Sequence, residues 1–286
     1  MTNKDDRDYI EGVILSNRER SGAGNTVVSL LASVPGKWEL ILKIIFRDVS
    51  ARYRQSFLGY LWALIMPLAA LGIFSLISKY RILPMGQLDM PYILFGVWSL
   101  SVWQLFTNTL TGCTNSLANA GPLVTKLNFP KDVLVLSAVG QPVIEFLIRA
   151  VFVIALFLFY RYAPGFDVIW VPLILVSIIL LSVGMGFFLS IANLLTRDVG
   201  NIVTLATVIG IFLAPVMYPA PVRWPFTIVN YINPVSPLLI ATQDLLSGNS
   251  LSHPWALLVS TLISISIFIL GWKFFLYVLP RAIERA

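Results

Sequence analysis

The chain has 286 residues, of which 57% are hydrophobic and only 12% are charged. A soluble domain carries about 25% charged residues, so this composition excludes an ordinary soluble protein and indicates an integral membrane protein. The net charge of +6 does not suggest a nucleic-acid partner. The single Cys excludes an intrachain disulfide, and with a single His it leaves no metal cluster to expect.

Residues 1–36 form a polar segment of mixed charge, without the apolar run of a cleavable signal peptide, and we expect a cytosolic tail. Residues 37–56 follow a helical period, with apolar residues on one face and basic residues on another. The apolar face consists of Trp38, Ile41, Ile45 and Val49, and the basic face of Lys43, Arg47, Ser50 and Arg54. This pattern predicts a helix that lies flat on a membrane surface.

From Phe57 onward apolar residues surround the helix axis, which predicts that the chain turns into the membrane. A crossing helix needs about 20 mostly apolar residues. Six stretches meet this condition, over 57–79, 91–113, 133–160, 168–193, 200–219 and 254–279. Lys and Arg are more numerous in the loops on the side of the two termini, which predicts that both termini are cytosolic.

The connection 219–250 is rich in proline and contains two apolar pieces, Phe226–Ile232 and Leu238–Leu246, each too short to cross. Non-helical backbone is tolerated at membrane depth only where protein buries it or where it lines a wet cavity. We interpret the pieces as two short re-entrant helices before the last span; the alternative is an ordinary external loop. The sequence therefore predicts an all-α integral membrane protein, with a transmembrane domain over 57–280 and a cytosolic end over 281–286.

The cytosolic loop 116–132 contains a short predicted helix that begins at Leu123. The exposed Phe and two Lys of this loop suit docking into a groove on a partner, although a simple surface turn is the alternative. The sequence has no G-x-x-x-x-G-K-[ST] motif, so this chain cannot hold ATP phosphates in a P-loop. If ATP powers the protein, another chain must hydrolyse it.

Three blocks occur in order: FRDVSARYRQSFLGYLWALIMPL (Phe46–Leu68), LVTKLNFPKDVLVLSAV (Leu123–Val139), and TRDVGNIVTLATVIGIFLAPVMYP with NPVSPL (Thr196–Pro219 and Asn233–Leu238). Together they resemble the membrane permease subunits of ATP-binding-cassette exporters of polysaccharides, O-antigens and teichoic acids. The likeness covers roughly residues 37–280. It departs from the family pattern where Met66, and not Asn, precedes Pro67.

The resemblance implies a homodimer of six-span subunits, preceded by an interface helix, that works with two copies of a separate P-loop ATPase. That ATPase would bind ATP and Mg, so this chain would need no cofactor. By matching position, the residues that couple to the ATPase would be Lys126, Leu127, Phe129, Pro130 and Lys131. The interface helix and the cytosolic entrance would hold Lys43, Arg47, Arg52, Tyr53 and Arg54.

A sugar polymer can slide along aromatic rings, because they pack against its apolar C–H faces. The candidates for such a path are Trp62, Tyr92, Phe95, Trp98, Trp103 and Phe106. The alternative is that these rings belong to interfacial belts or fill the interior. Glu145 and Arg149 lie deep in a predicted span, four residues apart, and indicate either a packed ion pair or a polar patch on the path.

We therefore expect a subunit of an ATP-driven exporter in the bacterial cytoplasmic membrane, without enzyme activity of its own, whose substrate is a lipid-linked O-antigen-like or capsular glycan. A wall teichoic acid exporter is an alternative, since no residue identifies the glycan. A membrane-embedded glycan-modifying enzyme is a less favoured alternative, because the loop 219–253 supplies only Arg223, Asp244 and His253. A secondary transporter is weaker still, since the sequence shows no internal repeat.

Overall fold

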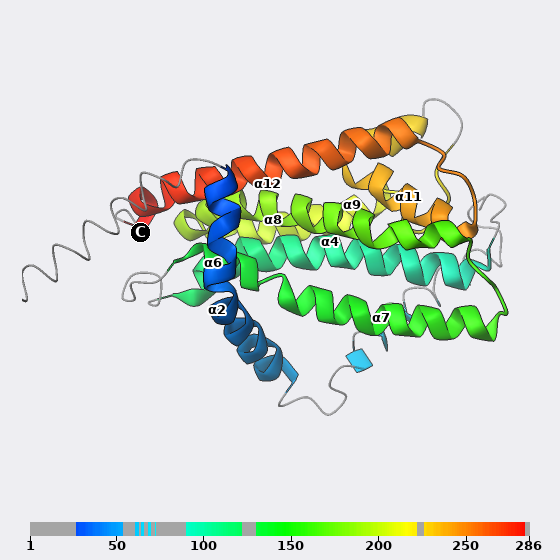
Figure 1. Ribbon diagram of the computed structural model, residues 1–286, viewed down its shortest axis with the longest axis horizontal. Coiled ribbons are helices and arrows are strands. Elements are labelled where there is room, and N and C mark those ends of the chain that lie inside the picture. The colour runs from blue at the N-terminus through cyan, green and yellow to red at the C-terminus, as the bar shows by residue number, and fades with distance from the viewer. Residues whose placement is uncertain are drawn as a thin grey trace, which may run out of the picture.

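The computed structural model of the chain describes residues 27–53, a few residues between 61 and 72, and residues 90–121, 130–221 and 226–283. The regular elements in these ranges are all helices, which confirms the predicted all-α class (Figure 1). The predicted first span, 57–79, and the short helix predicted in the loop 116–132 fall largely outside the described residues.

Four long helices lie side by side in a bundle (Figure 1): α4 (Tyr92–Ala120), α7 (Gly140–Phe159), α8 (Val171–Leu195) and α12 (Pro254–Ile283). The short helices α6 (Asp132–Ser137) and η2 (Phe166–Trp170) lead into α7 and α8. Three stretches of the described chain are long and apolar enough to cross a membrane: Asp132–Phe159, Phe166–Leu195 and Pro254–Ala282. They agree with the spans predicted over 133–160, 168–193 and 254–279. The helix predicted over 91–113 is α4, which has the length but carries more polar side chains.

The helix α9 (Asp198–Leu213) is shorter than predicted. Its 16 residues rise about 24 Å, less than the hydrocarbon thickness of about 30 Å, so α9 by itself is too short to cross, and the span over 200–219 stays a prediction. The chain reaches Pro215 here, which has no N–H to continue the helical hydrogen bonds. Residues 214–217 are non-helical and buried by neighbouring protein, the condition under which such backbone is tolerated at membrane depth.

Beyond this break, three short helices lie at the end of the bundle opposite the C-terminus (Figure 1): η3 (Phe226–Ile228), α10 (Val229–Ile232) and α11 (Val235–Ser247). They coincide with the two apolar pieces noted in the sequence. Most residues of α11 are buried, and this helix contacts α4, α8 and α12. This end of the connection is therefore part of the core, which argues against an ordinary external loop.

The helix α2 (Val27–Tyr53) crosses the other helices at the end of the bundle that holds the C-terminus (Figure 1). It begins at Val27, ahead of the predicted start at residue 37, and Pro35 lies within it. Ile41 and Val49 of the predicted apolar face are buried.

Trp38, which the sequence places on the apolar face, is 54% exposed and is not covered by neighbouring protein as Ile41 and Val49 are. It lies one and two helical turns before Leu42 and Phe46, which are also exposed. These three side chains form an apolar stripe beside the exposed basic residues. α2 therefore has three faces: one packed on protein, one apolar and open, and one charged, as in a helix that lies in the plane of a membrane surface.

The central helix α8 approaches two neighbours closely at glycines. A Cβ atom at Gly184 would lie 2.6 Å from the backbone of Phe268 on α12. A Cβ atom at Gly186 would collide with the side chain of Cys113 on α4. Small residues at such contacts let membrane helices pack backbone to backbone.

We predict that Gly184→Ala destabilises the bundle by about 1–3 kcal/mol, because its methyl group would need space that the Phe268 backbone occupies. Thermal unfolding of the purified protein in detergent measures this. The matched control is Gly36→Ala in α2, where no atom lies within 4 Å of the new Cβ and stability should hold or rise slightly. Equal stability of both variants would contradict the close packing of α8 on α12.

Candidate functional site

The carboxylate of Asp132 joins three helices at the end of the bundle that holds the C-terminus. Its Oδ2 accepts hydrogen bonds from Lys37 Nζ of α2 at 2.6 Å and from Trp272 Nε1 of α12 at 3.3 Å. Asp132 is the first residue of α6 and its side chain is 1% exposed, whereas that of Lys37 is 21% exposed. A buried carboxylate is costly unless it is paired and hydrogen-bonded, and these two donors offset part of that cost at Oδ2, whereas the buried Oδ1 has no hydrogen-bond partner among the described residues.

Close packing surrounds this carboxylate. The indole of Trp272 stacks on Phe187 of α8, with ring centroids 5.9 Å apart. The side chain of Ile45 on α2 occupies the space where a Cβ atom on Gly140, the first residue of α7, would lie. We call these contacts the Asp132 junction, made by Lys37, Ile45, Asp132, Gly140, Phe187 and Trp272. Through it α2, α6, α7, α8 and α12 are in contact.

A layer of polar side chains connects α4 and α7 inside the bundle. Arg149 Nη1 donates to Gln104 Oε1 at 2.6 Å, and Asn108 Nδ2 donates to Glu145 Oε2 at 3.3 Å. Gln141 Nε2 also donates to Glu145, at 2.9 Å. Glu145 and Arg149 are both buried, so each needs such partners. In this layer two residues one turn apart on α4 bond to two residues one turn apart on α7. These bonds fix the rotation of each helix about its own axis relative to the other.

At the other end of the bundle, side chains satisfy the carbonyl groups that the end of α9 leaves free. Gln243 Nε2 of α11 donates to Pro215 O and to Ser99 Oγ, each at 2.8 Å. Asn233 Nδ2 donates to Leu213 O at 3.1 Å, and Tyr92 OH donates to Met217 O at 3.2 Å. The broken helix is therefore held in place by α4 and α11.

The tight turn between α8 and α9 is held by an amide from α8. Asn193 Oδ1 accepts a hydrogen bond from the Gly200 N–H at 2.7 Å, and its Nδ2 donates to Asn115 Oδ1 at 3.0 Å. The N-cap residue of α9, Arg197, makes no side-chain cap hydrogen bond, and Asp198 after it is exposed. Asn193 instead accepts the hydrogen bond of the Gly200 N–H, one of the N–H groups that the start of α9 leaves free. The described residues contain no group of three or more His, Cys, Asp or Glu that could hold a metal ion.

Comparison with known proteins decides the family. The family model of ABC-2 type transporters matches residues 39–247, which is most of the chain and extends from α2 to the end of α11. The chain belongs to the ABC-2 type transporter family. It is therefore the membrane subunit of a transporter and not a catalytic subunit, and the family implies an ATPase partner.

Curated relatives of this permease share similar lengths with it. An O-antigen export system permease protein RfbA of Klebsiella pneumoniae is 27% identical over 244 residues, which cover 81% of this chain and 91% of the relative. A second protein of the same name from that organism is 26% identical over 225 residues, covering 76% and 84%. One from Myxococcus xanthus is 26% identical over 180 residues, covering 63% and 68%.

The residues predicted to couple the permease to its ATPase are described only in part. Lys126, Leu127 and Phe129 lie outside the described residues, whereas Pro130 is exposed and Lys131 is half-buried. Both directly precede Asp132, so the loop 116–132 ends in the Asp132 junction. The coupling role of these residues stays a prediction.

The predicted interface residues follow α2. Lys43 is exposed and donates to Glu39 at 2.6 Å, and this ammonium holds the pKa of Glu39 below its usual range. Arg47 is exposed and pairs with Asp48 at 2.8 Å. Arg52 and Tyr53 lie in the last turn of α2, with side chains outside the described residues, and Arg54 lies wholly outside them. The two described cations thus face away from the bundle, on the side open to a partner.

The aromatic residues predicted to line a path divide into two groups. Trp62 is 45% exposed, and Tyr92 is half-buried. Four others are buried against neighbouring helices of the same subunit: Phe95, Trp98, Trp103 and Phe106. Trp98 also donates to Thr242 Oγ1 of α11 at 3.0 Å. A polymer could reach these four rings only if α4 moved relative to its neighbours, and their role in a path stays a prediction.

The Glu145–Arg149 pair was predicted from its spacing, and the structure adds the amides of α4 that complete the polar layer. A direct contact between the two charges stays a prediction. Sequence reasoning missed Trp272 and Asn193 as functional partners. The available signals were an indole two turns before the end of the last span and an amide in the last turn of an apolar helix. Neither signal identifies its partner.

We predict that Lys37→Met destabilises the permease by about 1–3 kcal/mol, because it leaves the buried Asp132 carboxylate without its cation. Thermal unfolding in detergent measures the change. The matched control is Lys43→Met, whose ion pair with Glu39 is exposed and whose loss should cost less than about 0.5 kcal/mol. If both variants unfold at the same temperature, Lys37 does not anchor α2.

Proposed function

We propose that this permease is the transmembrane subunit of an ATP-driven exporter that moves a lipid-linked glycan of the O-antigen type across the bacterial cytoplasmic membrane. The names of the relatives support this substrate, since this chain spans nearly the whole length of one of them. In this proposal the end of the bundle with α2 and the C-terminus is cytosolic, and α10 and α11 lie at the outer face. The residues 57–79 would then complete six spans, with α9 and the buried segment 214–217 together making one of them.

The observation that carries the proposal is the Asp132 junction. An ATPase that seats on the loop 116–132 would push on the residues directly before Asp132. Because Asp132 is bonded to Lys37 of α2 and to Trp272 of α12, that push would reach the surface helix and the last span together. A simple anchor helix would not need a buried carboxylate to connect it to the end of such a loop.

The permease would act as a homodimer with two copies of the P-loop ATPase. A symmetric dimer places a pathway on its two-fold axis, where a single small bundle leaves little room for a polymer. The helix α9 presents exposed apolar side chains along its length, which include Ile202, Leu205, Val208 and Phe212. Such a face is available to the second subunit or to lipid. ATP and Mg would be bound by the ATPase alone.

We predict that the permease co-purifies with a P-loop ATPase and that ATP hydrolysis in lipid vesicles rises when a lipid-linked glycan is added. Replacing Lys126, Phe129 and Lys131 together by Ala should abolish assembly with the ATPase, because these residues would form the docking surface. Replacing Arg52 and Arg54 together by Gln should leave assembly intact and weaken transport, since they would meet the phosphate of the arriving substrate. Failure of the wild-type chain to assemble with any ATPase would overturn the proposal.

A further inference from the structure

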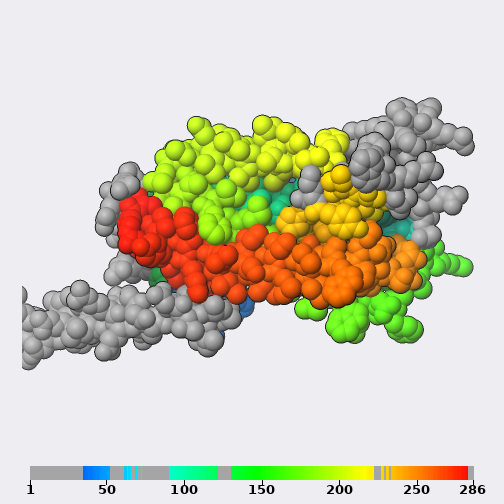
Figure 2. Space-filling view, turned by 90° about the horizontal axis from the view of Figure 1, so that it is seen from above, coloured from blue at the N-terminus to red at the C-terminus, as the bar shows by residue number. Residues whose placement is uncertain are grey.

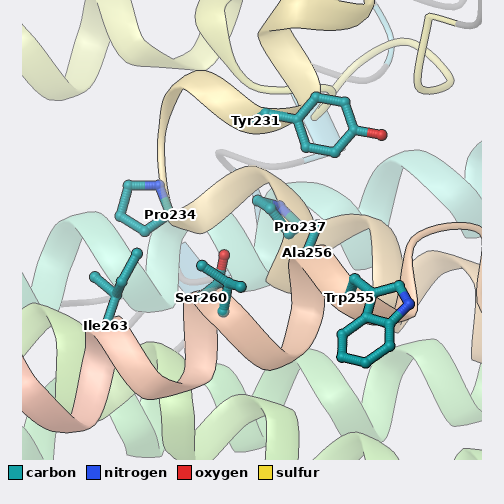
Figure 3. Close-up of a pocket in the computed structure, with 8 residues that line it drawn as sticks. Tyr231, Pro234, Pro237, Trp255, Ala256, Ser260 and Ile263 are labelled. Atoms are coloured by element: carbon teal, nitrogen blue, oxygen red, sulfur yellow. The ribbon is translucent and has the colours of Figure 1, made fainter.

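A groove of about 400 Å³ lies between the start of α12 and the segment that joins α10 to α11, within the size range of small-molecule sites. Figure 3 shows Tyr231, Pro234 and Pro237 on one side of it and the residues of α12 on the other. Ala256 and Ser260 are small and lie opposite the two prolines, which is why space remains here. Trp255, Val259 and Ile263 complete the α12 side of the groove.

The groove has a polar end and an apolar end. Tyr231 and Trp255 are exposed, and Tyr231 OH lies 3.0 Å from His253 Nδ1 just before α12 begins. From Trp255 to Ile263 the helix rises about 12 Å along the bundle, and apart from Ser260 the α12 side of the groove beyond Trp255 is aliphatic. A Tyr and a Trp at one end of an apolar surface are typical of the boundary between headgroups and hydrocarbon.

We propose that this groove binds one acyl chain of an outer-leaflet phospholipid, with the headgroup beside Tyr231 and His253. α12 is apolar and long enough to cross a membrane, and Figure 2 shows it running along the surface with the segment 233–250 against its first half. The side chains that flank the groove on this helix, such as Leu258 and Leu262, are exposed and apolar, as on a face that meets lipid. This inference rests on the proposed orientation, in which α12 begins at the outer face.

A glycan fits this groove less well than an acyl chain. Sugars need several converging hydrogen-bond groups, whereas the lining offers only the hydroxyls of Tyr231 and Ser260 and the indole N–H of Trp255. A second copy of this chain also fits less well, since membrane helices approach each other through small residues and this rim consists of bulky Trp255, Val259 and Ile263. The bound chain would fill the space between α12 and the segment 231–237 and so support the helices α10 and α11.

The test uses the permease with its ATPase in vesicles that contain a phospholipid with a photoreactive group at the end of one acyl chain. Illumination and peptide mapping should place the label on 255–263 and 231–237. The variant Val259→Trp fills the groove, and displacing even two methylene groups should lower this labelling about tenfold. The control Leu258→Trp, whose parent residue is 50% exposed like Val259, lies outside the lining and should label as the wild type does.

Equal labelling of both variants, or no label on these peptides in the wild type, would overturn the inference. So would cross-linking between two copies through a Cys at 259, because a second subunit would then cover the groove. Val259→Trp must still co-purify with the ATPase; if it does not, Tyr231→Trp provides a second filled groove. Because the readout is lipid labelling and not transport, a failed lipid site and a failed exporter assignment remain distinguishable.

Discussion

One buried carboxylate holds together the end of the bundle that contains the C-terminus. Asp132 accepts a hydrogen bond from Lys37 and another from Trp272, and so brings the surface helix, the first turn of α6 and the last span to one point. Without these donors its burial would cost several kcal/mol. The same residue directly follows the loop that, in our proposal, contacts the ATPase. The contact that stabilises this end of the bundle would therefore also be the contact that carries force.

Elsewhere in the bundle, polar side chains also bond to partners on other helices. In hydrocarbon every backbone or side-chain polar group needs a partner inside the protein. Gln243 and Asn233 supply partners to carbonyls beyond the end of α9, and Gln104 and Asn108 supply partners to the charges of α7. Because these bonds join different helices, they fix rotation and depth, which apolar contacts between lipid-like side chains do not. Movement during transport would have to exchange these bonds or carry the bonded helices together.

The sequence predicted the elements better than their connections. Periodicity and hydropathy located the apolar helices, the surface helix and the two short pieces of 226–247, since each depends on local composition. The end of α9 before Pro215 could have been anticipated, but the run 200–219 is mostly apolar and long enough to suggest one uninterrupted helix. The helical period placed Trp38 with Ile41 and Val49 on one apolar face, but it cannot say which part of that face neighbouring protein covers. The Asp132 junction joins residues far apart in the sequence, and nothing local to Lys37 or Trp272 identifies the other.

The most direct test of the account measures how many glycans are exported for each ATP hydrolysed, in vesicles that contain the permease and its ATPase. Lys37→Met should lower this ratio at least about fivefold in assembled complexes, because α2 would no longer follow the loop before Asp132. Lys43→Met, which removes only an exposed ion pair, should keep the wild-type ratio. An unchanged ratio in Lys37→Met would contradict the claim that the Asp132 junction transmits force.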